Sequence, residues 1–483
     1  MKKTLLLLTF AMFVASGCTG KVAHVQRDDW APDVKAAIND FMDCYAGTEG
    51  AYAVFDCDNT TLIFDVERQL VLHQLESMSF AMTPERLPEV LASLCTPGKW
   101  NYEDWIADIS AAYRKLYERF GPFSSRGVGA EVQEALSQDP QWQEFSTKMA
   151  TLYDVFSENE GHIPGCLWIL YWFDGMSEQE VYDLALRSNN IYKNRETKER
   201  IWTSPAGIES RVGRVTYRFV DGIQVTENTK ELWKALKDNG IDIWVCSGSG
   251  LQPILAAIDA FGLHDYVTGV QAMTIALDST GRYVNDYDYE APGAWLATEN
   301  GWQADSTRKA GCQPAKEGKV SAIVNAVQPR YGCGPIAGFM DATGDFNFCT
   351  EFSSLKLVIC FNRATRSVTD GGGLVAETAI YQRDFLGYDL RKANAAGDTF
   401  YVLQGREENG LRSFRPSNAT LLFGKSEEKL FEGERNYAQL DYMKIHEMST
   451  KEALEKFAIE TDIPNALGFK YGFTAQYAGY HSR

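Results

Sequence analysis

The sequence lacks the features that mark nucleic-acid-binding proteins and cysteine-rich zinc proteins. Basic residues are outnumbered, with 47 Lys and Arg against 65 Asp and Glu, and the formal net charge is −18. Nonspecific nucleic-acid binding needs a basic surface, so we expect no nucleic-acid partner. No two cysteines have the C-x-x-C spacing of cysteine-rich zinc sites. The chain also has no internal repeat and no low-complexity segment.

Long apolar runs are missing after the N-terminus. Lys2 and Lys3 precede an apolar stretch from Leu5 to Val14, which is shorter than the ~18 residues that a membrane helix needs. Small residues at 15–17 then lead to Cys18. This segment resembles a bacterial lipoprotein signal peptide, and an ordinary signal peptide with an incidental cysteine is the alternative. The resemblance implies removal of residues 1–17, lipidation of Cys18, and an exported protein that faces the periplasm and contacts the membrane through its lipid alone.

The cysteines do not suggest a fully paired set. Ten are present, and nine remain when Cys18 is set aside. An odd number is awkward for complete disulfide pairing in an oxidising compartment. Cys57 and Cys246 lie at the ends of apolar runs, and we expect them to be buried thiols. Cys312 and Cys333 lie in loop-like sequence and form the favoured candidate disulfide.

The order of the apolar patterns predicts an α/β protein with an inserted helical domain. Residues 49–64 begin with a strand, and residues 65–224 have apolar residues mostly at helical spacing. Within 225–365, helices and strands alternate at lengths typical of a parallel sheet with crossover helices. We therefore predict a doubly wound parallel sheet from the first and third of these segments. Residues 18–48 form an N-terminal segment, and residues 366–483 an extension packed on the core.

Polar residues follow several of the apolar runs, at positions where a buried strand would normally have apolar residues. Asp is depleted in strands and costly to bury without a partner. In an open parallel sheet, however, binding sites form where the strands end. Each residue alone is common at a helix cap or a surface, but the set in this order predicts a site. Its members are Asp56, Asp58, Ser247, Lys319, Asp341 and Asp345.

The spacing of these residues resembles the motifs of the haloacid dehalogenase superfamily of phosphohydrolases. In that family a strand is followed by D-x-D-x-T, a second strand by Ser or Thr, a Lys opens a helix, and a third strand carries G-D-x-x-x-D. The matching residues are Asp56, Asp58 and Thr60 for the first motif, Ser247 for the second, Lys319 for the third, and Asp341 and Asp345 for the fourth. The resemblance covers roughly residues 49–365 and implies a Rossmann-like core with a cap domain.

Two positions depart from the family pattern or leave a choice open. Met340 stands where the fourth motif usually has Gly. An alternative frame that uses Gly344 and Asp345 loses the second acid, because residue 349 is Cys, so the first frame is preferred. Lys316 competes with Lys319 for the third motif.

The resemblance also implies a mechanism with Mg²⁺ as the cofactor and a small phosphomonoester as the substrate. Asp56 would attack phosphorus and form an aspartyl-phosphate, and Asp58 would act as general acid and then as general base. The expected phosphate-binding residues are Thr60, Ser247, Gly248 and Lys319. The expected metal-binding residues are Asp56, Asp58 through its backbone carbonyl, Asp341 and Asp345. An acid at Asp58 is typical of phosphatases and mutases, and it argues against dehalogenation or ion pumping.

The inserted helical region would shield the site and select the leaving group. The export signal and the large cap most resemble exported phosphorylcholine or phosphoserine phosphatases. Aromatic side chains would suit the choline cation, and an Arg would suit the serine carboxylate. Six of the 11 tryptophans lie in this region and either fill its core or form a cage: Trp100, Trp105, Trp142, Trp168, Trp172 and Trp202. The available arginines are Arg114, Arg187 and Arg195. A tethered binding protein that has lost catalysis is the alternative function, and the oligomeric state is open.

Overall fold

The computed structural model describes residues 21–365, 371–430, 450 and 454, and its central feature is an eight-stranded sheet. The six strands from β12 to β5 are parallel, and β8 and β9 are antiparallel to their neighbours. The predicted α/β class, with a doubly wound parallel sheet, is therefore confirmed. In spatial order the strands are β12 (Phe400–Gln404), β11 (Leu357–Phe361), β10 (Ala337–Met340), β1 (Tyr52–Phe55), β4 (Asp242–Gly250), β5 (Gly269–Met273), β8 (Pro292–Thr298) and β9 (Gly301–Lys309).

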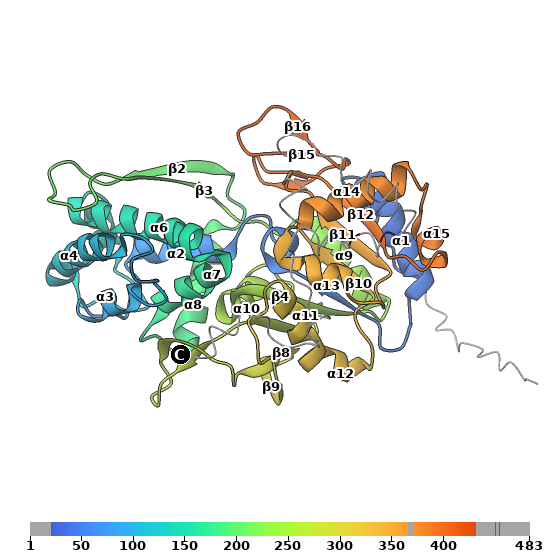
Figure 1. The fold of residues 1–483 in the computed structure, drawn as a ribbon, viewed down its shortest axis with the longest axis horizontal. Coiled ribbons are helices and arrows are strands. Elements are labelled where there is room, and N and C mark those ends of the chain that lie inside the picture. The colour runs from blue at the N-terminus through green and yellow to red at the C-terminus, as the bar shows by residue number, and fades with distance from the viewer. Residues whose placement is uncertain (1–20, 366–370, 431–449, 451–453, 455–483) are drawn as a thin grey trace, which may run out of the picture.

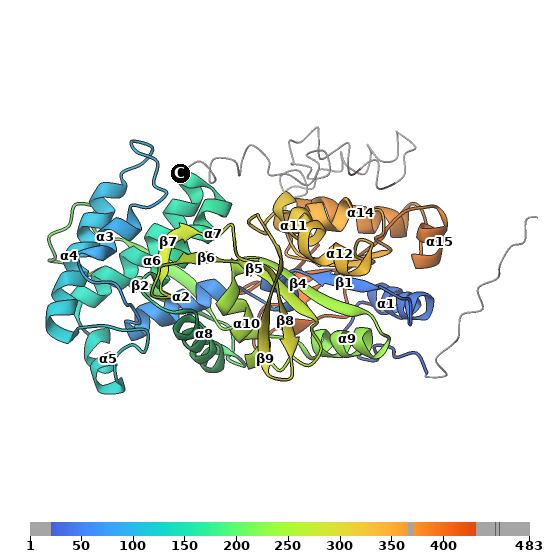
Figure 2. The same ribbon diagram turned by 90° about the horizontal axis from the view of Figure 1, so that it is seen from below.

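Helices cover both faces of the sheet because the buried strands are apolar on both sides. In β1, Ala53 and Phe55 belong to one core cluster, and Tyr52 and Val54 belong to another. The first face packs against α1 (Pro32–Tyr45), α9 (Glu227–Asp238), α10 (Leu251–Ala260) and α15 (Leu390–Ala395). The second packs against α11 (Glu317–Ala322), α13 (Phe346–Thr350) and α14 (Gly371–Asp384), with α12 (Gln328–Tyr331) beside them (Figure 2).

The strand order reverses around β1. After β1, the chain next enters the sheet at β4 on one side of it, and only later returns to β10 on the other side. Such a switch point separates the loops that leave the carboxyl ends of neighbouring strands and so opens a crevice there. The sheet topology therefore places a candidate site at the end of β1.

A helical lobe (residues 66–221) lies beside the sheet, on the left in Figure 1. Its helix α8 (Glu178–Tyr192) begins with a capping box in which Ser177 and Glu180 hydrogen-bond to each other's backbone N–H groups. Its helices are α2 (Val66–Ser77), α3 (Arg86–Leu91), α4 (Tyr102–Phe120), α5 (Ala130–Ser137), α6 (Pro140–Glu160), α7 (His162–Leu170) and α8 (Glu178–Tyr192). The lobe also contains an antiparallel hairpin of β2 (Lys198–Thr203) and β3 (Thr216–Asp221), which the sequence analysis did not expect.

A second hairpin connects the sheet to the helical lobe. It consists of β6 (Ile275–Leu277) and β7 (Tyr283–Tyr287), and Figure 2 shows it beside α7. Arg86 of the lobe donates a hydrogen bond to Asn285 Oδ1 at 2.7 Å, and Tyr283 is buried in the lobe's apolar core. This hairpin lies between β5 and β8 in the sequence. The lobe is therefore formed by two separate segments of the chain.

Residues after 365 supply the edge strand β12 and a small second sheet. That sheet has the order β14-β13-β15-β16, with β13 (Arg406–Glu407), β14 (Ser413–Phe414), β15 (Thr420–Leu421) and β16 (Glu428–Lys429). The expected signal peptide, its Cys18 and much of the expected C-terminal extension lie outside the described residues. Within the described residues, no helix has the length and apolar character needed to span a membrane.

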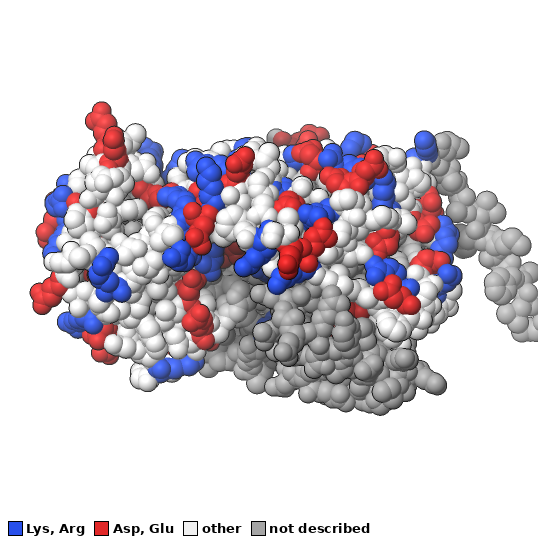
Figure 3. Space-filling model, turned by 90° about the horizontal axis from the view of Figure 1, so that it is seen from above, with Lys and Arg blue, Asp and Glu red and all other residues white. Residues whose placement is uncertain are grey.

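The surface carries charges of both signs (Figure 3), and the cysteines of the described residues are free thiols. On the face shown in Figure 3, basic and acidic side chains of the described residues are interspersed. Cys57 and Cys246 are buried thiols, as predicted. The predicted disulfide between Cys312 and Cys333 is wrong, because both thiols are free. They donate to different carbonyls, Cys312 to Gly318 at 3.2 Å and Cys333 to Gly50 at 3.6 Å.

Candidate active site

Three carboxylates gather at the end of β1. Asp56 directly follows this strand, and its backbone N–H donates to Phe339 O of β10 at 3.1 Å, which aligns the two strand ends. Asp341 follows β10, and the short helical turn Thr343–Asp345 brings back a third carboxylate. Side-chain oxygens of Asp56, Asp341 and Asp345 lie within 4.8 Å of one another, and all three residues are buried. Carboxylate oxygens in such a cluster are the ligands that Mg²⁺ prefers, so this donor set fits the ion.

Lys319 is the buried cation of this cluster. Its Nζ lies 2.6 Å from Asp56 Oδ1 and 2.5 Å from Asp345 Oδ1, and the residue is only 2% exposed. Burial disfavours the charged amine, but the carboxylates of Asp345 and Asp56 outweigh this effect and raise the pKa of Lys319 well above its usual value. Lys316 also lines the cavity. The structure thus places both candidate lysines at the site, with Lys319 in direct contact with the acids.

Asp58 is turned away from the three-carboxylate cluster. Its Oδ1 accepts a hydrogen bond from the Val66 N–H at 2.7 Å, at the start of α2, and its Oδ2 accepts one from the Ser249 hydroxyl at 2.6 Å. Burial and the negative charge of Asp65 together raise the pKa of Asp58 well above its usual value. A carboxyl group in this environment is suited to carry and donate a proton at neutral pH.

The expected phosphate-binding residues do not all face the cavity. Ser247 and Gly248 line it, and the Ser247 hydroxyl accepts a hydrogen bond from the Ser249 N–H at 3.1 Å. Thr60 is not among the lining residues, and its hydroxyl instead donates to Asp341 Oδ1 at 3.3 Å. In this geometry Thr60 orients a candidate metal ligand.

The structure adds an arginine that sequence reasoning missed. Arg363 follows β11, and its guanidinium lies 2.8 Å from Asp341 Oδ2. Because β11 is paired in parallel with β10, its carboxyl end reaches the same edge of the sheet. The signal was therefore present in the sequence, as a charged residue just after the apolar run that forms β11.

The helical lobe supplies much of the opposite wall. The cavity has a volume of about 140 Å³. Asp65 and Glu67 at the start of α2, Tyr153 on α6, and His162 and Cys166 on α7 line it. Burial lowers the pKa of His162, and burial together with nearby acids raises the pKa values of Glu67 and Cys166 well above their usual ranges. The wall facing the metal cluster is thus acidic on one side and neutral on the other.

Of the two alternatives for the tryptophans of the helical region, the structure supports core packing and not a cage at this cavity. None of the six tryptophans of the helical region lines this cavity. They pack instead within the lobe's apolar core, where Trp168 stacks on Phe156 with 4.6 Å between ring centroids and Trp142 donates to Leu75 O at 3.0 Å.

The three arginines considered for carboxylate binding lie elsewhere as well. Arg114 pairs with Glu85, and Arg187 donates to Ser125 O. Arg195 lies 3.9 Å from Asp221. None of them lines the cavity, so the arginine that reaches it comes from the sheet rather than the lobe.

Comparisons with known proteins support the fold. No protein-family model matches the chain, and no curated protein matches it. Among solved structures, a conserved protein of unknown function from Anaerococcus prevotii aligns over 83% of this chain and 99% of its own, with 25% identity and a TM-score of 0.64. Cytosolic 5′-nucleotidase IIIB bound to cytidine aligns over 90% of this chain and 95% of its own, with 10% identity and a TM-score of 0.25. The first match shows that this arrangement of elements occurs in another protein.

Proposed function

We propose that this protein is a Mg²⁺-dependent phosphomonoesterase of the haloacid dehalogenase type, which acts through an aspartyl-phosphate on Asp56. One observation carries the proposal. Three buried carboxylates, a buried Lys319 and Asp58, whose pKa is raised, line one small cavity at the switch point of a parallel sheet. Each group has a role in moving a phosphoryl group from an alcohol to water.

The carboxylates of Asp56, Asp341 and Asp345 would hold the ion, together with the backbone carbonyl of Asp58. When bound, Mg²⁺ offsets the negative charge that otherwise repels an anionic nucleophile from a phosphate. Arg363 and Thr60 orient Asp341 from two sides, at 2.8 Å and 3.3 Å. Such supporting contacts fix a ligating carboxylate in one direction.

The chemistry then divides between two aspartates. A carboxylate oxygen of Asp56 attacks phosphorus, a P–O bond forms, and the bond to the leaving alcohol breaks. Asp58 gives its proton to the departing oxygen and afterwards takes a proton from the water that hydrolyses the acyl phosphate. The hydrogen bonds from Val66 and Ser249 keep the Asp58 carboxyl in place through both transfers.

The transferring group is an anion, and the cavity has cations for it. Lys319 reaches Asp56 directly, and the hydroxyl of Ser247 and the backbone at Gly248 line the same side. These donors would hold phosphoryl oxygens and stabilise the charge that spreads over them during transfer. Lys316 lines the cavity as a further cation near its wall.

The leaving group proposed here is small and carries an ammonium. The cavity of about 140 Å³ leaves little room, and Asp65 and Glu67 face it. Asp65 favours a cation, and Arg363 and Lys316, which line the same cavity, offer partners for a carboxylate. Phosphorylcholine and phosphoserine both carry an ammonium, and phosphoserine adds the carboxylate. Both substrates therefore fit the charges of the cavity, and no tryptophan cage favours choline.

Phosphate release from p-nitrophenyl phosphate, measured with and without Mg²⁺, tests the reaction. We expect Mg²⁺-dependent turnover that Asp56→Asn abolishes, because the amide lacks the attacking oxygen. Asp238→Asn changes an exposed acid on α9 and serves as the matched control, with turnover retained. Substantial hydrolysis by Asp56→Asn would sink the assignment. Absence of turnover by the native chain with all metals supplied would favour the binding-protein alternative.

A further inference from the structure

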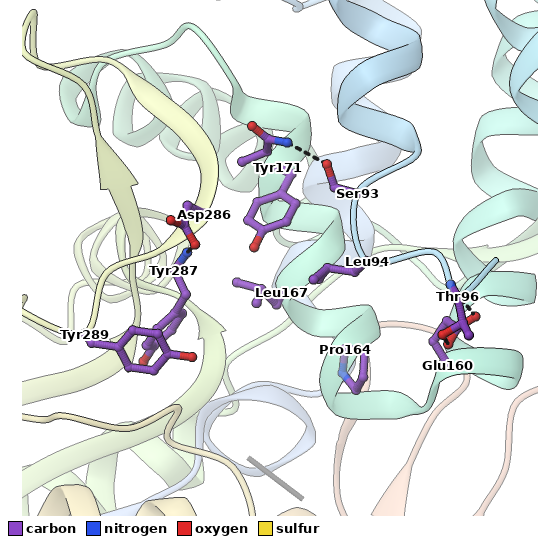
Figure 4. Close-up of a pocket in the computed structure, with 11 residues that line it drawn as sticks. Ser93, Leu94, Thr96, Glu160, Pro164, Leu167, Tyr171, Asp286, Tyr287 and Tyr289 are labelled. Carbon is purple, nitrogen blue, oxygen red and sulfur yellow. Dashed lines mark hydrogen bonds between the residues drawn. The ribbon is translucent and has the colours of Figure 1, made fainter. Parts of the chain in front are cut away.

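A second and larger cavity lies between the helical lobe and the β6–β7 hairpin, with a volume of about 450 Å³. Figure 4 shows its two sides. Asp286 and Tyr287 come from β7 and Tyr289 from just after it, and Leu167 of α7 and the following Tyr171 face them. This volume falls in the range of small-molecule sites, which are mostly apolar with a few placed polar groups.

Tyrosines dominate the hairpin end of this cavity. The rings of Tyr287 and Tyr289 lie 4.5 Å apart between centroids at an interplanar angle of 63°, so their faces form a corner. The Tyr287 hydroxyl donates to Cys312 O at 2.8 Å, which holds this ring in place. Tyr171 approaches from α7 and is only 2% exposed. Aromatic faces that meet at an angle attract a cation through their quadrupoles.

The charged side chains that line the cavity are acidic. Asp286 lies beside the tyrosine corner, and its Oδ1 accepts the Tyr287 N–H at 2.8 Å. Burial and this carboxylate raise the pKa of Tyr289 to about 12. At the other end, Glu160 is offset by Lys99 at 3.1 Å. No Lys or Arg is among the described residues that line the cavity, so its hairpin end favours positive charge.

This cavity is separate from the candidate active site, although α7 borders both. His162 and Cys166 line the catalytic cavity, whereas Pro164, Leu167 and the following Tyr171 line the larger one. Between them, the Gln313 side chain donates to Ile163 O at 3.2 Å. The proposed phosphatase reaction uses none of the residues at the hairpin end.

We propose that this cavity is a binding site for a small organic cation, an amine or quaternary ammonium, which sits in the corner of Tyr287 and Tyr289 with Asp286 as its counter-charge. Tyr171 and Leu167 cover the apolar side of the ligand. The site does not depend on catalysis at Asp56.

Calorimetric titration of the full chain with choline, and with its uncharged isostere in which carbon replaces nitrogen, tests the site. We expect choline to bind more tightly than the isostere. Tyr289→Ala should weaken choline binding about three- to tenfold, because one aromatic face is lost, whereas Tyr289→Phe should retain it. Asp286→Asn should weaken it about two- to fivefold, as expected for a partly exposed charge.

Two further variants distinguish this site from the catalytic cavity and from a general charge effect. Glu290→Gln removes the acid next to Tyr289 in the sequence, which does not line the cavity, and we expect binding to be retained. Glu67→Gln alters the catalytic cavity and should leave this binding event intact. Equal affinity for the isostere, unchanged affinity in Tyr289→Ala and Asp286→Asn, or loss of binding in Glu67→Gln would each overturn the proposal.

Discussion

Arg406 joins the C-terminal segment to the loop that carries the proposed nucleophile. Its guanidinium donates to the Asn59 backbone carbonyl at 3.0 Å and to Asn59 Oδ1 at 3.1 Å. It also forms two hydrogen bonds to Glu408 Oε1, at 3.0 and 2.7 Å. Asn59 has a positive φ of 60°, a conformation that few residues other than Gly adopt without local support. Arg406 therefore holds a strained turn between Asp58 and Thr60.

Loss of the Arg406 side chain lowers the free energy of unfolding for two reasons. Arg406→Met leaves the Glu408 carboxylate buried without its cation, and breaking a buried pair costs about 3–5 kcal/mol. The double variant Arg406→Met, Glu408→Gln removes that unpaired charge but still deprives Asn59 of both donors. Each buried acceptor left unsatisfied costs about 1–3 kcal/mol. We therefore expect the double variant to be more stable than the single one and less stable than the native chain in urea unfolding.

The kinetic effect distinguishes a positioning role from a merely structural one. If Arg406 holds the turn, both variants should lower kcat on p-nitrophenyl phosphate by about 10- to 100-fold, because small misplacement of reacting groups is costly. Arg415→Met is the matched control. Arg415 lies in the same segment, but its guanidinium pairs with Glu407 at 2.9 Å and with Glu428. It should lose stability and keep kcat. A double variant with native kcat would refute the positioning role.

The remaining predictions concern the metal, the substrate and the membrane anchor. Asp341→Asn should raise the Mg²⁺ concentration needed for half-maximal activity, since one charged ligand is lost, and a Mg²⁺ titration of turnover checks this. Asp65→Asn should lower kcat/KM for phosphorylcholine more than for p-nitrophenyl phosphate, because only the former carries a cation for this cavity carboxylate to attract, and Asn can still cap α2; equal losses would count against a role for Asp65 in binding the cation. Cys18→Ser should move the protein from the membrane fraction to the soluble fraction of the cells, and unchanged fractionation would exclude the lipid anchor.

The fold and the acids of the site were predictable because local patterns encode them. An apolar run that ends in Asp56, and another that ends in Asp341, mark strand ends whatever the rest of the chain does. The parallel sheet then brings those ends to one edge, since β1 pairs in parallel with both β10 and β4. Arg363 carried the same signal and was missed because it lies outside the family motifs.

The wall contributed by the helical lobe was not predictable in this way. His162 and Cys166 lie four residues apart on α7, but nothing in the sequence shows which face of that helix meets the sheet. The same uncertainty left two alternatives open for the tryptophans, which are apolar enough to fill a core and aromatic enough to bind a cation, and the structure supports the core. The β2–β3 hairpin was missed although Tyr217 and Phe219 alternate with exposed residues, because the surrounding helices dominate the pattern.

The clustering of acidic side chains explains why basic side chains from several segments converge on the site. Asp56 and Asp345 are buried and Asp58 is half-buried at the same site, and burial raises the pKa of each of these carboxyl groups. Removing such groups from water costs free energy that their own contacts do not fully return. Lys319, Arg363 and Arg406 supply compensating charge or hydrogen bonds, and each comes from a different part of the chain. Contacts from several parts of the fold therefore offset the free-energy cost of burying these acids. The C-terminal segment takes part in this through Arg406, as directly as the strand that precedes the nucleophile.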